Sequence, residues 1–370
     1  MTATLTAALA SPGYRGDLTA LRRLLAERLT GEEHAGPTAV TELLTLRHRF
    51  AVLTGARPEE LLALGTAVDR SVERFPTWPD LRLLRGALAL AVHRPDLATA
   101  ALDAVPGLSE LPAGRVLAAD IASFTGDYRA AEEGYRSAAE EDSLWDTTAR
   151  LAALAVATGR FDEADRLYAA AEDDLTAKQM RSFAWVRVQR ADLARALGDR
   201  EKAERFLDDA DAGYPGWWFV AAHRAALDLA AGRGERAIDG YRGVLADVDR
   251  PEFREALGTA FDRVGRTDCA AECHATALSA YLASAARGEV HYLHHLAAFH
   301  ADVHPHHQAA LDWARQDAEL RRTGSTLSLL AWCLHKAGRR AEALATLDEA
   351  FALGAGDPLL LRRAREIRHG

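Results

Sequence analysis

The segment Gly126-Asp-Tyr-Arg-Ala-Ala131 introduces a phrase that recurs along the chain: a glycine, four residues, then an alanine. Glycine readily adopts the left-handed backbone that ends a helix, and the polar residues after it can begin the next helix. The phrase therefore predicts the turn between two antiparallel helices. Its six clear copies have their glycine and alanine at Gly126 and Ala131, Gly159 and Ala164, Gly198 and Ala203, Gly232 and Ala237, Gly265 and Ala270, and Gly338 and Ala343.

The spacing of these turns is nearly constant. Successive glycines are separated by 33, 39, 34, 33 and 73 residues. The last interval is about two periods long and contains a degenerate copy, with Pro305 in the place of the glycine and Ala310 in the place of the alanine. A fixed period of this length is the signature of stacked helical repeats, so seven copies are expected.

Small side chains recur in the same register. Twelve residues before the repeat alanine every copy has Ala or Gly, and seven residues after it five of the seven copies have Ala. Small side chains at matched positions allow two helices to approach closely where they cross. The two sets are Ala119, Ala152, Ala191, Ala225, Gly258, Ala298 and Ala331, and Ala138, Ala171, Ala210, Val244, Ala277, Asp317 and Ala350.

The combined pattern resembles the tetratricopeptide repeat family over at least residues 110–358. The resemblance implies an all-α, right-handed superhelical solenoid of antiparallel helix pairs, in which the first helix of each pair lines a concave groove. The aromatic residue that the family has near the start of the first helix is absent from most copies. The chain is therefore expected to be a divergent member.

The rest of the chain continues the layout as one solenoid. Residues 1–36 are expected to form an N-terminal capping helix, at about 17–29, because terminal repeats cannot bury both faces. Residues 37–109 are expected to form degenerate helix pairs, 110–358 the seven repeats, and 359–370 a C-terminal capping helix.

Composition restricts the classes of partner. The chain has 370 residues, a formal net charge of −9 and three cysteines, which do not make a disulfide framework. An acidic chain is not expected to bind nucleic acid or an anionic membrane surface. No apolar run reaches the length of a transmembrane helix, and residues 1–11 lack the basic residues of a secretory signal. We therefore expect a cytoplasmic protein.

The repeat alanine serves as the reference position from which the groove residues are counted. Residues 15, 11 and 8 positions before it are expected to face the groove, and residues 18 positions before it to lie at the rim. Exposed aromatic and charged side chains are typical of binding surfaces. Trp185, Phe299 and Trp332 could instead belong to the core between repeats. The candidate groove residues are Asp120, Trp185, Asp192, Arg195, Phe219, Glu255, Asp262, Tyr292, His295, Phe299, Asp302, Trp332 and His335.

These patterns favour a non-catalytic scaffold that binds a protein or peptide and needs no cofactor. The sequence has no phosphate-binding loop, nucleophile elbow or kinase motif, and the repeats use almost the whole chain. Self-association through the ends of the solenoid is a weaker option.

A cluster of histidines supports an alternative function to that of a binding scaffold. Seven of the 14 histidines fall within residues 291–307. His291 and His295 are four residues apart on one helix face, and Asp302 and His335 could join them around a divalent metal ion. That reading predicts an enzyme or a metal-dependent accessory protein. The same histidines could instead be structural, or could form a pH-sensitive or anion-binding patch.

Overall fold

The structure is a computed structural model that describes residues 13–28, 36–141 and 144–369. These residues are almost entirely helical and contain no β-strand. The helices are α2 (Tyr14–Arg28), α3 (Pro37–Thr54), α4 (Pro58–Arg74), α5 (Pro79–Ala91), α6 (Pro95–Asp103), the 3-10 helix η2 (Leu108–Glu110), α7 (Pro112–Thr125), α8 (Tyr128–Glu141), α9 (Trp145–Ala157), α10 (Phe161–Asp173), α11 (Met180–Ala196), α12 (Arg200–Gly213), α13 (Trp218–Ala230), α14 (Gly234–Asp247), α15 (Pro251–Arg263), α16 (Thr267–Ala286), α17 (Leu293–Ala298), the π-helix η3 (Phe299–Val303), α18 (His307–Leu320), α19 (Gly324–Lys336), α20 (Arg340–Ala352) and α21 (Pro358–His369).

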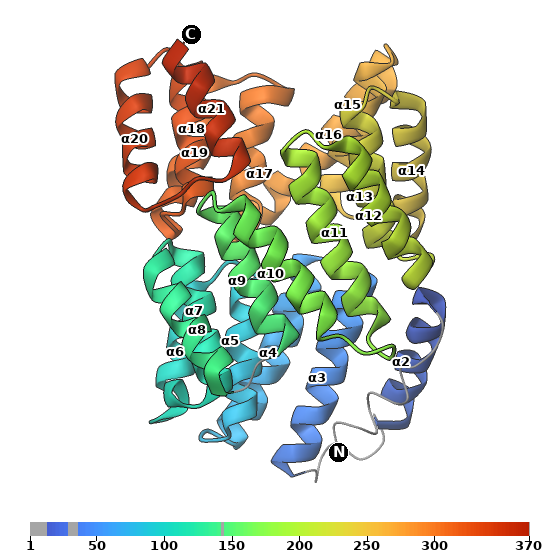
Figure 1. The fold of residues 1–370 in the computed structure, drawn as a ribbon, viewed down its shortest axis with the longest axis vertical. Coiled ribbons are helices and arrows are strands. Elements are labelled where there is room, and N and C mark those ends of the chain that lie inside the picture. The colour runs from blue at the N-terminus through green and yellow to red at the C-terminus, as the bar shows by residue number, and fades with distance from the viewer. Residues whose placement is uncertain (1–12, 29–35, 142–143, 370) are drawn as a thin grey trace.

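The expected all-α solenoid of helix pairs is confirmed (Figure 1). The expected N-terminal capping helix corresponds to α2, and the expected C-terminal one to α21. The predictions made for residues 1–12 and 29–35 lie outside the described residues. Within the described part of the chain, the helices are all too short or too polar to cross a membrane.

Close packing at the helix crossings follows the predicted register. All seven repeat alanines are at most 1% exposed, from Ala131 to Ala343. The six turn glycines all have positive φ, between 74° for Gly338 and 96° for Gly126. At two crossings the approach is close enough that a Cβ on Gly134 or Gly240 would lie 2.9 Å from the alanine Cβ opposite. Small side chains and left-handed turns therefore set the geometry of each repeat.

The sixth repeat departs from this register. Ala298, expected at the crossing, is only half-buried, whereas Ala297 and Ala301 are buried. The cause is the π-helical segment η3, which follows α17 directly and adds a residue to the helical turn. The added residue changes which side chains of this segment face α18.

A further copy of the repeat phrase lies upstream of those found in the sequence. His93 has a φ of 61°, which makes it the one non-glycine residue with positive φ among those described. It stands 33 residues before Gly126, and the buried Ala98 stands 33 residues before Ala131. His93 therefore takes the place of the turn glycine between α5 and α6.

The first helices of successive pairs form the inner wall of the solenoid. They touch one another directly, as α5 touches α7, α11 touches α13 and α17 touches α19. Each second helix packs mainly on the first helices beside it.

The solenoid coils far enough to touch itself, which the repeat pattern alone does not predict. At one end, α2 lies beside the segment that joins α12 and α13 (Figure 1). The Tyr214 hydroxyl donates to the Asp17 carboxylate at 2.6 Å, and Trp218 Nε1 donates to the Leu53 carbonyl at 2.8 Å. These partners are 197 and 165 residues apart in the sequence.

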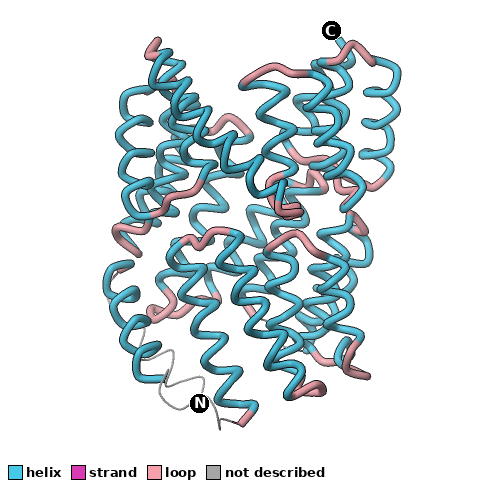
Figure 2. Tube along the Cα trace, turned by 180° about the vertical axis from the view of Figure 1, so that it is seen from behind, coloured by secondary structure: helices cyan, strands magenta, loops and turns pink. Residues whose placement is uncertain are grey.

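Further contacts of this kind join α5 to α9 with α17 to α21, and the close stacking is visible from behind (Figure 2). The backbone N–H of Gly324 donates to the Tyr128 hydroxyl at 2.8 Å, and that of Gly356 donates to the Ala157 carbonyl at 2.8 Å. We call the whole set, from α2 to α21, the inter-turn contact. It joins the earlier and later halves of the chain.

Candidate partner-binding groove

The predicted groove residues differ in how far they are available to a partner. Tyr292 and Phe299 are 4% and 1% exposed, so they are core residues in this structure rather than groove-lining ones. Phe299 points inward from η3 and packs edge-on against His274, and Tyr292 packs against Tyr281. The other candidates are either exposed, namely Arg195, Asp262 and Asp302, or half-buried, namely Asp120, Trp185, Asp192, Phe219, Glu255, His295, Trp332 and His335.

Asp120 links two neighbouring first helices, α7 and α9. Its carboxylate accepts a hydrogen bond from the Tyr135 hydroxyl at 2.7 Å and one from Arg150 Nε at 2.9 Å. Arg150 also pairs with Asp146 at 3.1 Å. The carboxylate is thus held in a fixed position between the two helices.

Asp192 makes the equivalent link between α11 and α13. Its carboxylate lies 2.8 Å from His223 Nδ1 and 3.4 Å from Arg195. Burial would raise the pKa of Asp192, but hydrogen bonding to His223 and the charge of Arg195 outweigh it and hold the pKa below its usual range. The predicted rim residue Phe219 packs edge-on against the His223 ring at 4.5 Å. This part of the groove therefore presents an anionic carboxylate beside an aromatic ring.

Trp332 is the aromatic residue with the most defined surroundings in the C-terminal part of the groove. Its Nε1 donates to the Asp302 carboxylate at 2.9 Å, across from η3 to α19. The His335 ring stacks on it at 5.6 Å with an interplanar angle of 29°. Lys336 Nζ lies 4.9 Å from the indole centre and 3.6 Å from Asp302. The half-buried indole is therefore oriented before any partner arrives.

Glu255 lies deeper than a typical groove residue. It accepts a hydrogen bond from the Tyr281 hydroxyl at 2.7 Å, and burial raises its pKa to about 7. The neighbouring Glu252 behaves in the opposite way: burial favours a higher pKa, but pairing with Arg250 holds the pKa below the usual range. Two adjacent carboxyl groups on α15 thus differ in charge near neutral pH.

The four residues proposed for a metal site have other neighbours. His295 stacks on Tyr281 at 5.4 Å, whereas Asp302 and His335 both contact Trp332. His291 lies against His93 at 4.6 Å. Among the residues described, no group of three or more His, Cys, Asp or Glu side chains is placed to hold one metal ion. The arrangement does not favour the metal reading, which stays a prediction.

Burial makes three histidines resist protonation. It is the main cause that lowers the pKa of His291 and of His295 to about 4. Burial, aided by the charge of Arg321, lowers the pKa of His93 to about 2. The His93 ring lies between Phe124 and His291, so it joins the two halves of the inter-turn contact. Sequence reasoning missed His93, although its 33-residue distance from Gly126 was a usable signal.

Comparisons with known proteins identify the fold alone. No family model and no curated protein matches the sequence. A human IFIT1 dimer with m7Gppp-AAAA is 15% identical, with 93% of this chain and 87% of that chain covered and a TM-score of 0.50. A monomeric IFIT1 mutant with the same molecule is 14% identical, with 92% and 77% covered and a TM-score of 0.52. A tetratricopeptide repeat protein from Parabacteroides merdae is 15% identical, with 67% and 92% covered and a TM-score of 0.49. The chain thus shares its all-α helical-repeat fold with these structures.

Proposed function

We propose that this protein is a non-catalytic cytoplasmic scaffold that holds a segment of a partner protein in its concave groove. The observation that carries the proposal is the setting of Trp332. Its indole is half-buried, its N–H is bonded to Asp302, and a cation and an imidazole pack against its ring. An aromatic side chain that is already ordered costs little entropy on binding, which is typical of residues that dominate binding energy.

Neighbouring positions support the same proposal. Asp120 and Asp192 are held by bonds to adjacent repeats, while their inner faces remain partly open. Between them, Ala153 is exposed on α9 and leaves room for a peptide backbone to approach. The proposed groove thus combines fixed carboxylate acceptors, an aromatic ring and a small side chain between them. This combination suits a peptide segment better than a small metabolite.

The test uses site-specific photo-crosslinking of the full chain in its native host cells. A benzophenone amino acid in place of Arg195 is expected to crosslink one partner reproducibly. The same group in place of Arg129, which is exposed on the second helix α8, is the control for non-specific capture. Equal capture at both positions, or turnover of a substrate by the isolated protein, would contradict the proposal.

Trp332→Ala is expected to weaken binding of the crosslinked partner by about tenfold or more, because such anchor residues are typically worth 2 kcal/mol or more. Leu282→Ala, at an exposed position on α16, is the matched control and should leave binding unchanged. If Trp332→Ala instead lowers the melting temperature while binding per folded molecule is intact, the indole is a core residue.

The proposal specifies a protein partner rather than nucleic acid. Although IFIT1 structures of similar fold contain m7Gppp-AAAA, this chain has a net charge of −9 and exposes carboxylates such as Asp262 in its groove. Fluorescence anisotropy with capped and uncapped oligoribonucleotides at 0.1 M salt is therefore expected to show no saturable binding. Elemental analysis and light scattering of the same untagged protein test the metal reading and self-association.

A further inference from the structure

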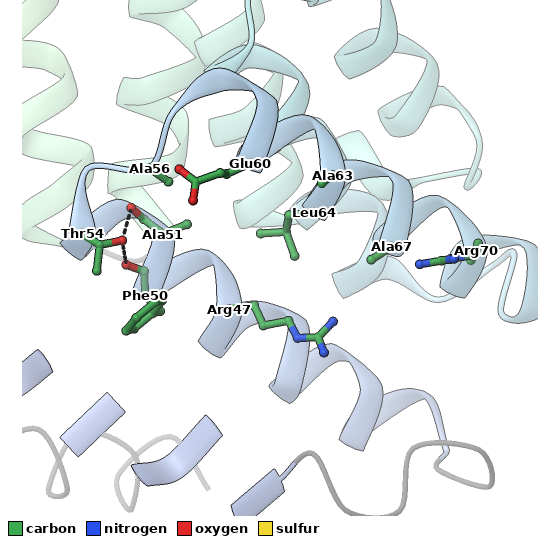
Figure 3. Close-up of a pocket in the computed structure, with 10 residues that line it drawn as sticks. All are labelled: Arg47, Phe50, Ala51, Thr54, Ala56, Glu60, Ala63, Leu64, Ala67 and Arg70. Atoms are coloured by element: carbon green, nitrogen blue, oxygen red, sulfur yellow. Dashed lines mark hydrogen bonds between the residues drawn. The ribbon is translucent and has the colours of Figure 1, made fainter. Parts of the chain in front are cut away.

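The first helix pair, α3 and α4, is packed differently from the later pairs. In the seven later pairs the repeat alanine, which faces the crossing, is buried. In this pair Ala63 is exposed, and Ala51 and Ala67 are only half-buried. They line a space of about 370 Å³ between the two helices (Figure 3). The crossing of this pair is therefore open.

The sequence explains why this crossing is open. Glu60 stands five residues after Gly55 and so occupies the place of the repeat alanine, while His48 occupies the small-residue place twelve positions earlier. Both side chains are larger than any that the clear copies have at these two places. Glu60 is used locally instead, where its carboxylate accepts a hydrogen bond from the Arg57 N–H at 2.7 Å. The small side chains that allow close approach in the clear copies are therefore absent from these two places.

The open crossing is a groove with charge at both ends. Phe50, Leu64 and the alanines form its apolar middle. Arg47 and Arg70 lie at one end and Glu60 towards the other, as expected for antiparallel helices (Figure 3). Glu60 and Arg70 are ten residues apart on α4, so at the 1.5 Å rise of a helix the groove is about 15 Å long. This length corresponds to about three turns of a bound helix.

We propose that the groove between α3 and α4 binds an amphipathic helix of a partner protein, with the acidic C-terminal end of that helix at Arg70. An apolar stripe on such a helix matches the middle of the groove. The C-terminal end of a helix carries partial negative charge and its N-terminal end partial positive charge. The Arg70 guanidinium and the Glu60 carboxylate, which also accepts from the Arg57 N–H, therefore favour one direction of binding over the other.

This inference does not rest on the proposed concave-groove function, because the two sites share no residue. The groove would be a second interaction surface at the first helix pair. Binding there would not require Trp332, and a partner held in the concave groove would not require Arg70. Each proposal can therefore fail while the other stands.

The test uses a designed peptide and the full chain. The probe is an acetylated Ala/Leu helix of about 16 residues, long enough to be helical, with two lysines in its first turn and two glutamates and a free carboxylate in its last. The control peptide has the lysines and glutamates exchanged and an amidated C-terminus. Fluorescence anisotropy is expected to show saturable binding of the probe and at least about tenfold weaker binding of the control.

Variants locate the binding. Ala63→Phe fills the groove from an exposed position and should abolish binding of the probe without lowering the melting temperature. Arg70→Glu should weaken binding of the probe and strengthen that of the control peptide. Arg129→Glu, an exposed charge reversal on α8, should change neither.

Several outcomes would overturn the proposal. Equal binding of both peptides, no binding of either, or binding that survives Ala63→Phe would each do so. If binding appears only after residues 1–12 are removed, the occupant is the chain's own N-terminal segment. If light scattering shows a dimer that Ala63→Phe converts to a monomer, the occupant is a second copy of this chain.

Discussion

Lowering the pH from 7 to 5 should destabilise this fold through three half-buried histidines at and beside the inter-turn contact. His291 and His295 have pKa values of about 4 in the folded chain, and His93 of about 2, against an ordinary value of 6.5. The charged groups that bear on them include Glu252 and Arg250, together with Arg321 and Asp317, which face His93.

The sign and size follow from proton linkage. Between pH 6.5 and about 4 the unfolded chain binds protons at these histidines and the folded chain does not, so stability is lost as the pH falls. Glu255 acts in the opposite direction, because its folded pKa of about 7 exceeds the ordinary 4.5. Three protons taken up on unfolding, less the one that Glu255 releases, leave about two near pH 5.5. Each contributes about 1.4 kcal/mol per pH unit, so the slope is about 3 kcal/mol per pH unit.

The assay counts protons directly, which avoids assuming that a repeat array unfolds in one step. Unfolding in urea at pH 5.5 is followed in a pH-stat, and proton uptake is compared between the wild type and His291→Gln. The variant should take up about one proton fewer. His307→Gln, at an exposed position, is the matched control for the loss of a histidine. Equal uptake by the wild type and His291→Gln would refute the reasoning.

Two further predictions test the packing. Ala191→Phe should overpack the crossing of α11 and α12 and lower the free energy of unfolding, measured by urea denaturation, by about 1–3 kcal/mol or more. The control Ala153→Phe, at an exposed position, should lower it little. Similar losses for both variants would show that the register is wrong. Tyr128→Phe should leave the Gly324 N–H without its acceptor and lower the free energy of unfolding by about 1–3 kcal/mol. The control is Tyr168→Phe, at a buried tyrosine whose hydroxyl makes no such bond. An unchanged melting temperature for Tyr128→Phe would mean that this contact does not stabilise the fold.

The sequence was sufficient to predict the helix pairs of the clear copies because a repeat packs mainly on its neighbours. The turn glycines and crossing alanines report a local requirement, namely left-handed backbone or close approach, and one residue type satisfies it in copy after copy. The same reasoning missed the upstream copy at His93, because a histidine in the place of a glycine hides the phrase. It also wrongly placed Ala298 at the helix crossing, because the repeat pattern does not predict the π-helical segment η3.

The inter-turn contact was beyond the sequence for a different reason. Whether Tyr214 reaches Asp17 depends on small rotations added over many successive repeats. An error of a few degrees per repeat accumulates until the two residues no longer meet. The groove assignments depend on the same accumulated geometry. Asp120 and Trp332 are half-buried and remain predicted groove residues, whereas Phe299, in η3, is buried in the core.

The inter-turn contact has a consequence for synthesis of the chain. Helix α2 is translated early, yet the groups that meet Tyr14 and Asp17 come from Pro215 and Tyr214, about 200 residues later. At about 5–20 residues per second, a ribosome needs about 10–40 s to supply them. During that interval Leu18 and Leu21, which are buried in the finished protein, can pack against α3 but not against later members of the same core cluster such as Tyr214. Early helices of this protein should therefore be clients of ribosome-associated chaperones, whereas the last helices meet a completed surface as soon as they emerge.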